Sequence, residues 1–110
     1  MPQMFIFISI HSLLQHHPKM KDLVYRFIDK LPQYIGRITV NNENKNWDEL
    51  LRSVHDLKGT SGNYGYPALA SLAETMETHT LEKDKYKLIL DFVELKATHQ
   101  KIIRGLDASA

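Results

Sequence analysis

The stretch SVHDLKGTSGNYGYP, Ser53–Pro67, brings together the side chains with the clearest chemistry in this chain. His55 is followed three residues later by Lys58, and glycines stand at positions 59, 62 and 65. A neutral imidazole is a nucleophile near neutral pH because its unperturbed pKa is about 6.5. A nearby ammonium group offsets the charge of an anion. The stretch therefore predicts a reactive histidine with little side-chain bulk around it.

The histidine lies in a predicted helix from about Trp47 to about Gly62. Asn46 is the predicted N-cap, with Glu49 three residues later as in a capping box. Successive residues advance by about 100° around a helix. On that basis one side of the helix faces the core and His55 lies near the opposite, exposed side. The predicted core side carries Trp47, Leu50, Val54, Leu57 and Ser61.

A strip of residues around His55 is the predicted docking face for another protein: Asp48, Leu51, Arg52, Gly59 and Gly62. An interior helical glycine costs up to about 1 kcal/mol relative to alanine. Glycines at i+4 and i+7 share the face of His55 and leave its ring open to a close approach. Leu51 is an apolar side chain on this strip, and Lys58 lies at its edge, near enough to meet a group carried on the ring. Gly65 is predicted to serve the following turn, although a fraying helix end also accounts for Gly62 and Gly65.

Apolar periodicity predicts further helices before and after this one. A short helix is expected over Ile6–Gln15, and a longer one starts at Pro18 and is bent at Pro32. A polar loop follows over Asn41–Asn46. Beyond the glycines, a helix opens at Pro67, and the last one runs from about Glu82 to about Arg104. The apolar residues assigned to the single stripe of that last helix are Tyr86, Ile89, Leu90, Val93, Ala97 and Ile103.

These elements predict an all-α fold, an antiparallel four-helix bundle with a short additional N-terminal helix. The 110 residues suit one domain, 1–110, and no cysteine is present. A net charge of +1 without a basic block gives no reason to expect nucleic acid as a partner. The apolar run Met4–Ile10 is too short to span a bilayer, and we expect it to pack on the core.

The residues HDLKGTSGNYG, His55–Gly65, resemble the histidine-containing phosphotransfer (HPt) domain of two-component phosphorelays. That family's pattern places a leucine, a lysine and a glycine at the positions of Leu57, Lys58 and Gly59, with small residues after them. FIDKLPQYIGRI and YPALASLAETME are similar to the helices before and after the motif. The resemblance extends from about residue 8 to about residue 106.

The resemblance implies that His55 accepts a phosphoryl group from the phospho-aspartate of one receiver domain and passes it to the aspartate of another. Lys58 would stabilise the phosphate. Magnesium would sit on the partner receiver, so no cofactor or metal is expected on this chain, and neither is kinase activity of its own. The domain would be cytoplasmic and monomeric, either free-standing or part of a hybrid sensor histidine kinase that tethers it to a membrane.

Three other interpretations compete with the resemblance. His55 and Asp56 are adjacent, as in HD-type metal-dependent phosphohydrolases, but neighbouring helical residues point about 100° apart. A di-metal helical bundle needs Glu-x-x-His pairs, and ETH and ELKATH have the wrong spacing. A non-catalytic helical interaction module would carry His55 as an ordinary surface residue. Replacing His55 by Gln separates the last interpretation from a relay.

Overall fold

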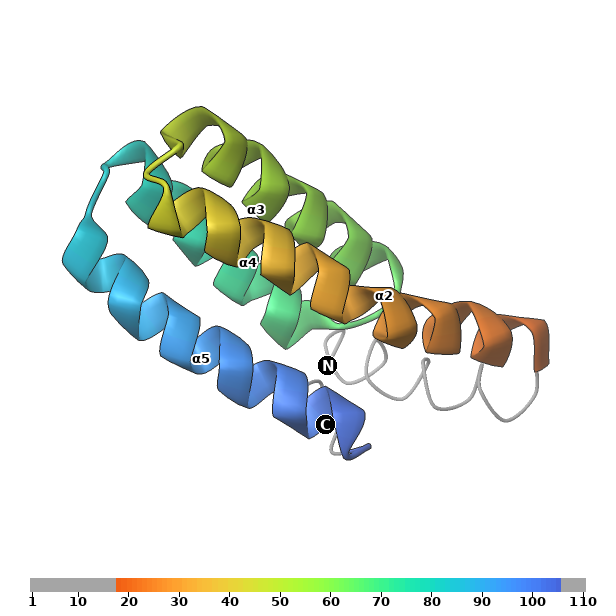
Figure 1. Ribbon diagram of the computed structural model, residues 1–110. Helices are drawn as coiled ribbons and strands as arrows, with labels where there is room; N and C mark the ends of the chain where they lie inside the picture. Colours follow the sequence, from red (N-terminus) through yellow and green to blue (C-terminus); the bar gives the residue numbers. More distant parts are fainter. Residues whose placement is uncertain (1–17, 106–110) are drawn as a thin grey trace, which may run out of the picture.

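Four helices joined by three-residue turns build the protein in the computed structural model, which describes residues 18–105 (Figure 1). They are α2 (Pro18–Glu43), α3 (Trp47–Asn63), α4 (Pro67–Leu81) and α5 (Lys85–Ile103). Each packs against its neighbours in the chain, and α2 also meets α5, so the four form an antiparallel bundle. Because residues 18–105 contain no strand, the predicted all-α class is confirmed. The predicted helix over Ile6–Gln15 and the run Met4–Ile10 lie outside the described residues.

The three turns share one backbone design. α2, α3 and α4 each end in a Schellman motif, in which the chain turns through a residue with positive φ and closes two backbone hydrogen bonds. Gly65, with φ of +80°, does this after α3, where Tyr66 N–H donates to the Ser61 carbonyl at 2.9 Å. Lys45 and Lys83, with φ of +53° and +54°, occupy the same position after α2 and α4. The three identical turns reverse the chain and set the helices side by side.

The core is a column of aliphatic side chains from all four helices, joined by the ring of Phe27, which stacks on Tyr64 and Tyr66. From α3, Leu50, Val54 and Leu57 are fully buried, as the periodicity predicted. The remaining buried apolar residues are Val24, Leu31, Ile38, Leu69, Ala73, Met76, Leu88, Leu95 and Ile102. α3 therefore turns one face into the bundle and leaves the opposite face free.

The helix boundaries follow the sequence signals with three differences, one of which is that α5 begins at Lys85 and not at about Glu82. Pro18 and Pro67 begin α2 and α4, and α2 continues through Pro32. However, α2 extends to Glu43, so the predicted loop over Asn41–Asn46 is reduced to its last three residues. Asn46 is the N-cap residue of α3, but its side chain makes no capping hydrogen bond. The predicted capping box therefore does not form.

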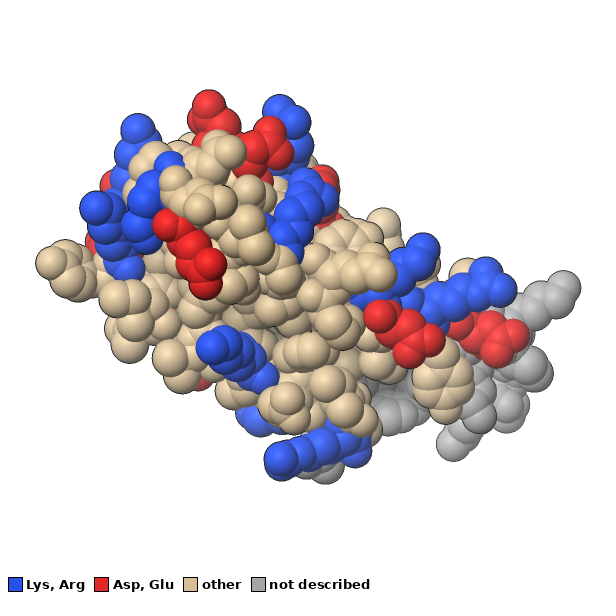
Figure 2. Space-filling model, in the orientation of Figure 1, with Lys and Arg blue, Asp and Glu red and all other residues tan. Residues whose placement is uncertain are grey.

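The orientation predicted for α5 is wrong. Tyr86, Ile89, Leu90 and Val93 are between 61% and 83% exposed, and Ile103 is exposed as well. Instead, Leu88, Leu95 and Ile102 point inward together with Asp91 and Thr98. A buried carboxylate is tolerated here because His79 of α4 lies 2.5 Å from Asp91 Oδ2 through its Nδ1 atom. Figure 2 accordingly shows largely uncharged surface along part of α5.

Candidate functional site

His55 stands on the outer face of α3, and its side chain is 67% exposed. Its face is the one opposite Leu50, Val54 and Leu57, whose burial holds the helix in this rotation. The predicted exposure of His55 is thus confirmed. A surface histidine of this kind is accessible to a macromolecular partner, provided that its neighbours leave room.

Glu77 of α4 is the immediate polar partner of His55. Its Oε2 atom lies 3.3 Å from His55 Nδ1, and its Oε1 atom lies 3.3 Å from Lys58 Nζ. The contact with Lys58 is an ion pair without hydrogen-bond geometry. The Glu77 side chain is only 18% exposed. One acidic side chain therefore holds both the histidine and the lysine of the motif.

The contact between Glu77 and Nδ1 decides which nitrogen of His55 is free. A carboxylate accepts a hydrogen bond, so it favours the neutral tautomer that carries its proton on Nδ1. The lone pair of that tautomer is on Nε2. Because the two ring nitrogens point in different directions, a contact at Nδ1 does not occupy Nε2. The contact with Glu77 therefore leaves Nε2 as the nitrogen available to a partner.

Two open hollows flank His55. The first, between α2 and α3, has a volume of about 440 Å³ and is lined by Tyr34, Arg37, His55, Asp56, Gly59, Thr60 and Asn63. The second, between α3 and α4, has a volume of about 370 Å³ and is lined by Asp48, Leu51, Arg52, His55, Glu77 and Leu81. His55 therefore lies between the two hollows, and each hollow is lined by both polar and apolar side chains.

The residues assigned to the docking strip all lie around His55 on this face. Asp48, Arg52, Gly59 and Gly62 are exposed and Leu51 is half-buried. A Cβ atom built at Gly59 or Gly62 would meet no atom within 4 Å outside the neighbouring backbone. The fold therefore does not need glycine at these two positions. Gly65 differs, since its φ of +80° belongs to the turn.

Among known protein families, the model of the Hpt domain matches residues 22–105. This chain belongs to the Hpt family. The match spans all of α3, α4 and α5 and most of α2, so it includes His55 and both of its flanking hollows. Searches of curated proteins and of solved structures gave no significant match.

Hpt domains are histidine phosphotransfer modules of two-component signalling, and they interact with the receiver domains of response regulators. The resemblance seen in the motif is therefore confirmed at the level of the family. Among residues 18–105, no three His, Asp or Glu side chains are grouped to hold a metal ion. None of the helices in that range has the length and apolarity to cross a bilayer.

Sequence reasoning missed Glu77 and Arg37. Glu77 is 22 residues from His55 and on another helix, so no local spacing points to it. Arg37 of α2 donates from Nη2 to Asp56 Oδ2 at 2.8 Å, and Asp56 is the residue next to His55. An acidic and a basic residue one turn apart on the same helix can be recognised as a pair from the sequence. The pairs of Glu77 and Arg37 join different helices, so they can be recognised only in the folded bundle.

Proposed function

We propose that this Hpt domain is a phosphorelay intermediate that accepts a phosphoryl group on His55 from the phospho-aspartate of one receiver and passes it to the aspartate of another. The 3.3 Å contact between His55 Nδ1 and Glu77 carries the proposal, because it leaves Nε2 free on an exposed side chain. Phosphoryl transfer asks chiefly for positioning and charge stabilisation, and this site offers both.

In the accepting step, the Nε2 lone pair attacks phosphorus in line with the acyl phosphate. The new N–P bond forms as the P–O bond breaks, and the aspartate leaves as a carboxylate with the bonding electron pair. The proton on Nδ1 stays in place, so the ring becomes a cation. Glu77 stabilises that charge as it develops, in the way a buried acid supports a catalytic imidazole. Transfer to the next receiver reverses the same step.

The proposal also assigns roles to Lys58, to the partner receiver and to the residues around His55. Lys58, held beside the ring by Glu77, stabilises the phosphate. Magnesium and most of the charge stabilisation come from the receiver, and the domain has no kinase activity of its own. Asp48, Leu51, Arg52, Gly59 and Gly62 form the docking face. The domain 1–110 acts as a cytoplasmic monomer, either alone or linked to a hybrid histidine kinase.

A transfer assay tests the proposal directly. The protein is mixed with pre-phosphorylated receiver domains from the same genome, and the label is checked for the acid lability and base stability of phosphohistidine. His55→Gln should abolish labelling, whereas His99→Gln, a histidine on α5, should not. Label that persists on the His55→Gln variant would exclude His55 as the acceptor. Failure to label the wild type with every receiver of that genome would remove the relay function.

Glu77 is proposed as a positioning residue, and two variants separate its two contributions. Glu77→Gln keeps an acceptor for the Nδ1 proton but loses the negative charge, while Glu77→Ala loses both. We expect transfer to slow by roughly fivefold in Glu77→Gln, since a hydrogen bond to a charged group contributes about 1 kcal/mol more than a hydrogen bond between neutral groups. Glu77→Ala should be slower still, and the ¹⁵N spectrum of its His55 should show a mixture of tautomers. An unchanged tautomer in Glu77→Ala would contradict the orienting role.

A further inference from the structure

The hollow between α2 and α3 is one of the two hollows that His55 lines, and it is the one without Glu77. Because Glu77 occupies Nδ1 on the α4 side, the space open to a group on the other ring nitrogen includes this hollow. Gly59, Thr60 and Asn63 line this hollow and contribute little bulk. Its volume of about 440 Å³ exceeds that of a phosphoryl group several times over. A phosphoryl group on Nε2 therefore fits without displacing any helix.

Arg37 is the cationic side chain that lines this hollow. Its guanidinium bonds Asp56 Oδ2 at 2.8 Å, and both side chains are less than half exposed, at 43% and 44%. Lys58, by contrast, is 3.3 Å from Glu77 on the α4 side of the ring. The lysine of the motif and the arginine of α2 thus lie on opposite sides of His55. The arginine lines the hollow that does not contain Glu77.

We propose that Arg37 binds the phosphoryl group carried on His55 and exchanges its contact with Asp56 for that group. The inference rests on the proposed function, since it concerns the phosphorylated form of the same histidine. A guanidinium presents several N–H donors in a planar fork and binds phosphate oxygens in pairs. It prefers a phosphoryl dianion to a single carboxylate because the dianion carries more charge.

Asp56 has a defined part in this exchange. In the unphosphorylated form it holds Arg37 against α3 and keeps the guanidinium beside the hollow. After phosphorylation, its carboxylate competes with the phosphoryl group for the same cation. Asp56 should therefore weaken the contact between Arg37 and phosphate, so that the phosphohistidine remains ready to give up its phosphoryl group.

The test uses phosphoramidate, a small donor that phosphorylates histidine with release of ammonia and needs no docking partner. Two readings are taken on the whole protein: the ¹⁵N–¹H resonance of Arg37 Nε before and after phosphorylation, and the half-life of the phosphohistidine. A guanidinium bound to the phosphoryl oxygens stabilises the phosphohistidine through charge-assisted hydrogen bonds and shields its phosphorus from attack by water. Removing that cation should therefore shorten the half-life.

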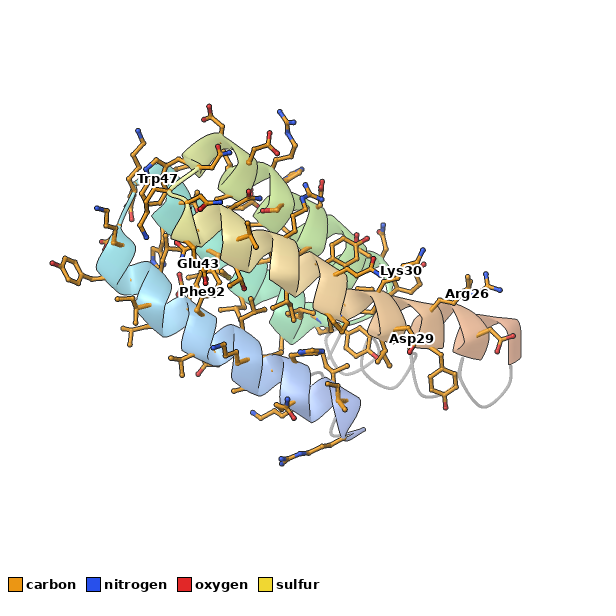
Figure 3. The ribbon with its side chains drawn as sticks, in the orientation of Figure 1. Arg26, Asp29, Lys30, Glu43, Trp47 and Phe92 are labelled. Carbon is orange, nitrogen blue, oxygen red and sulfur yellow. The ribbon has the colours of Figure 1, made fainter. Side chains whose placement is uncertain are left out.

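We expect the Arg37 resonance to shift on phosphorylation and Arg37→Gln to shorten the half-life by about two- to fivefold, the size typical of a half-exposed ion pair. Asp56→Asn should lengthen it, because Arg37 then has no competitor. Arg26→Gln is the charge-matched control on the same helix, on the part of α2 that projects from the bundle (Figure 3). It should leave the half-life unchanged.

The outcomes separate this inference from the proposed function. If His55 is phosphorylated but the Arg37 resonance and the half-life in Arg37→Gln stay as they were, the arginine does not bind the phosphoryl group. If Arg26→Gln shortens the half-life of the phosphohistidine as much as Arg37→Gln does, the effect comes from the net charge of the protein and not from a contact of Arg37. That result would also overturn the inference. If the wild-type histidine is never phosphorylated by phosphoramidate or by receivers, the proposed function falls and the inference with it.

Discussion

Gly59 offers a test in which stability and function should change in opposite directions. It lies inside α3, and a Cβ atom there would meet nothing within 4 Å. Its φ lies outside the positive range, so a side chain introduces no backbone strain. Alanine has a helix propensity about 0.8–1 kcal/mol more favourable than glycine. Gly59→Ala should therefore raise the free energy of unfolding by about that amount.

Gly59→Gln adds bulk at the same place. Glutamine is close to alanine in helix propensity, so this variant should also be more stable than the wild type, by about half a kcal/mol. Its side chain would project into the hollow that His55 shares with Gly59. A receiver that must bring its aspartate within bonding distance of Nε2 would then be obstructed. We expect phosphoryl transfer to slow by at least tenfold, about 1.4 kcal/mol in the barrier.

Urea unfolding and receiver transfer kinetics are measured on the same preparations. Gly36 of α2 is the matched control, because a Cβ atom there also meets nothing within 4 Å and Gly36 lines neither hollow. Gly36→Gln should be stabilised like Gly59→Gln and should transfer at the wild-type rate. Equal transfer rates for the two glutamine variants would refute the docking role of Gly59. A destabilised Gly59→Ala would refute the statement that the fold leaves this position open.

Four smaller predictions concern single side chains. Leu51→Asp should weaken receiver binding about tenfold in a titration, and an unchanged affinity would remove Leu51 from the docking face. Lys58→Ala should slow transfer severalfold while labelling of His55 persists; transfer at the wild-type rate would leave Lys58 without a role in it. Lys83→Gly should raise the free energy of unfolding by up to about 1 kcal/mol, because glycine adopts the positive φ of that turn without strain; a lower melting temperature would contradict this. Burial lowers the pKa of His99 below its ordinary 6.5, so the unfolded chain takes up a proton near pH 6 that the folded protein resists. The wild type should therefore lose more stability than His99→Gln between pH 7.5 and pH 5.5 in urea titrations, and equal losses would exclude this contribution.

The rotation of α3 was predictable because three large apolar residues share one face, on which the other fully buried residues, Ser53 and Ser61, are small. Leu50, Val54 and Leu57 repeat at steps of three and four, and every one of them is buried. Placing His55 on the outside required nothing further than the geometry of a helix. The motif then led to the right family because its residues are consecutive on one chain segment.

The rotation of α5 was not predictable in the same way. That helix carries apolar residues on two opposite faces, and the stripe with more large side chains is the exposed one. The inward face includes Asp91, whose burial depends on His79 of another helix. A pattern within one helix contains no information on such a partner. Periodicity alone therefore favours the wrong face.

Three different helices determine the surroundings of the two ring nitrogens of His55. α3 supplies the imidazole and keeps its surroundings small. In the relay that we propose, α4 selects the reacting nitrogen through Glu77, which lies 3.3 Å from Nδ1. α2 borders the other side of His55, with Arg37 paired to Asp56. Because Glu77 and Arg37 come from different helices, we expect that a change in how α2 or α4 packs on α3 would alter phosphoryl transfer by His55 even if the motif itself stayed the same.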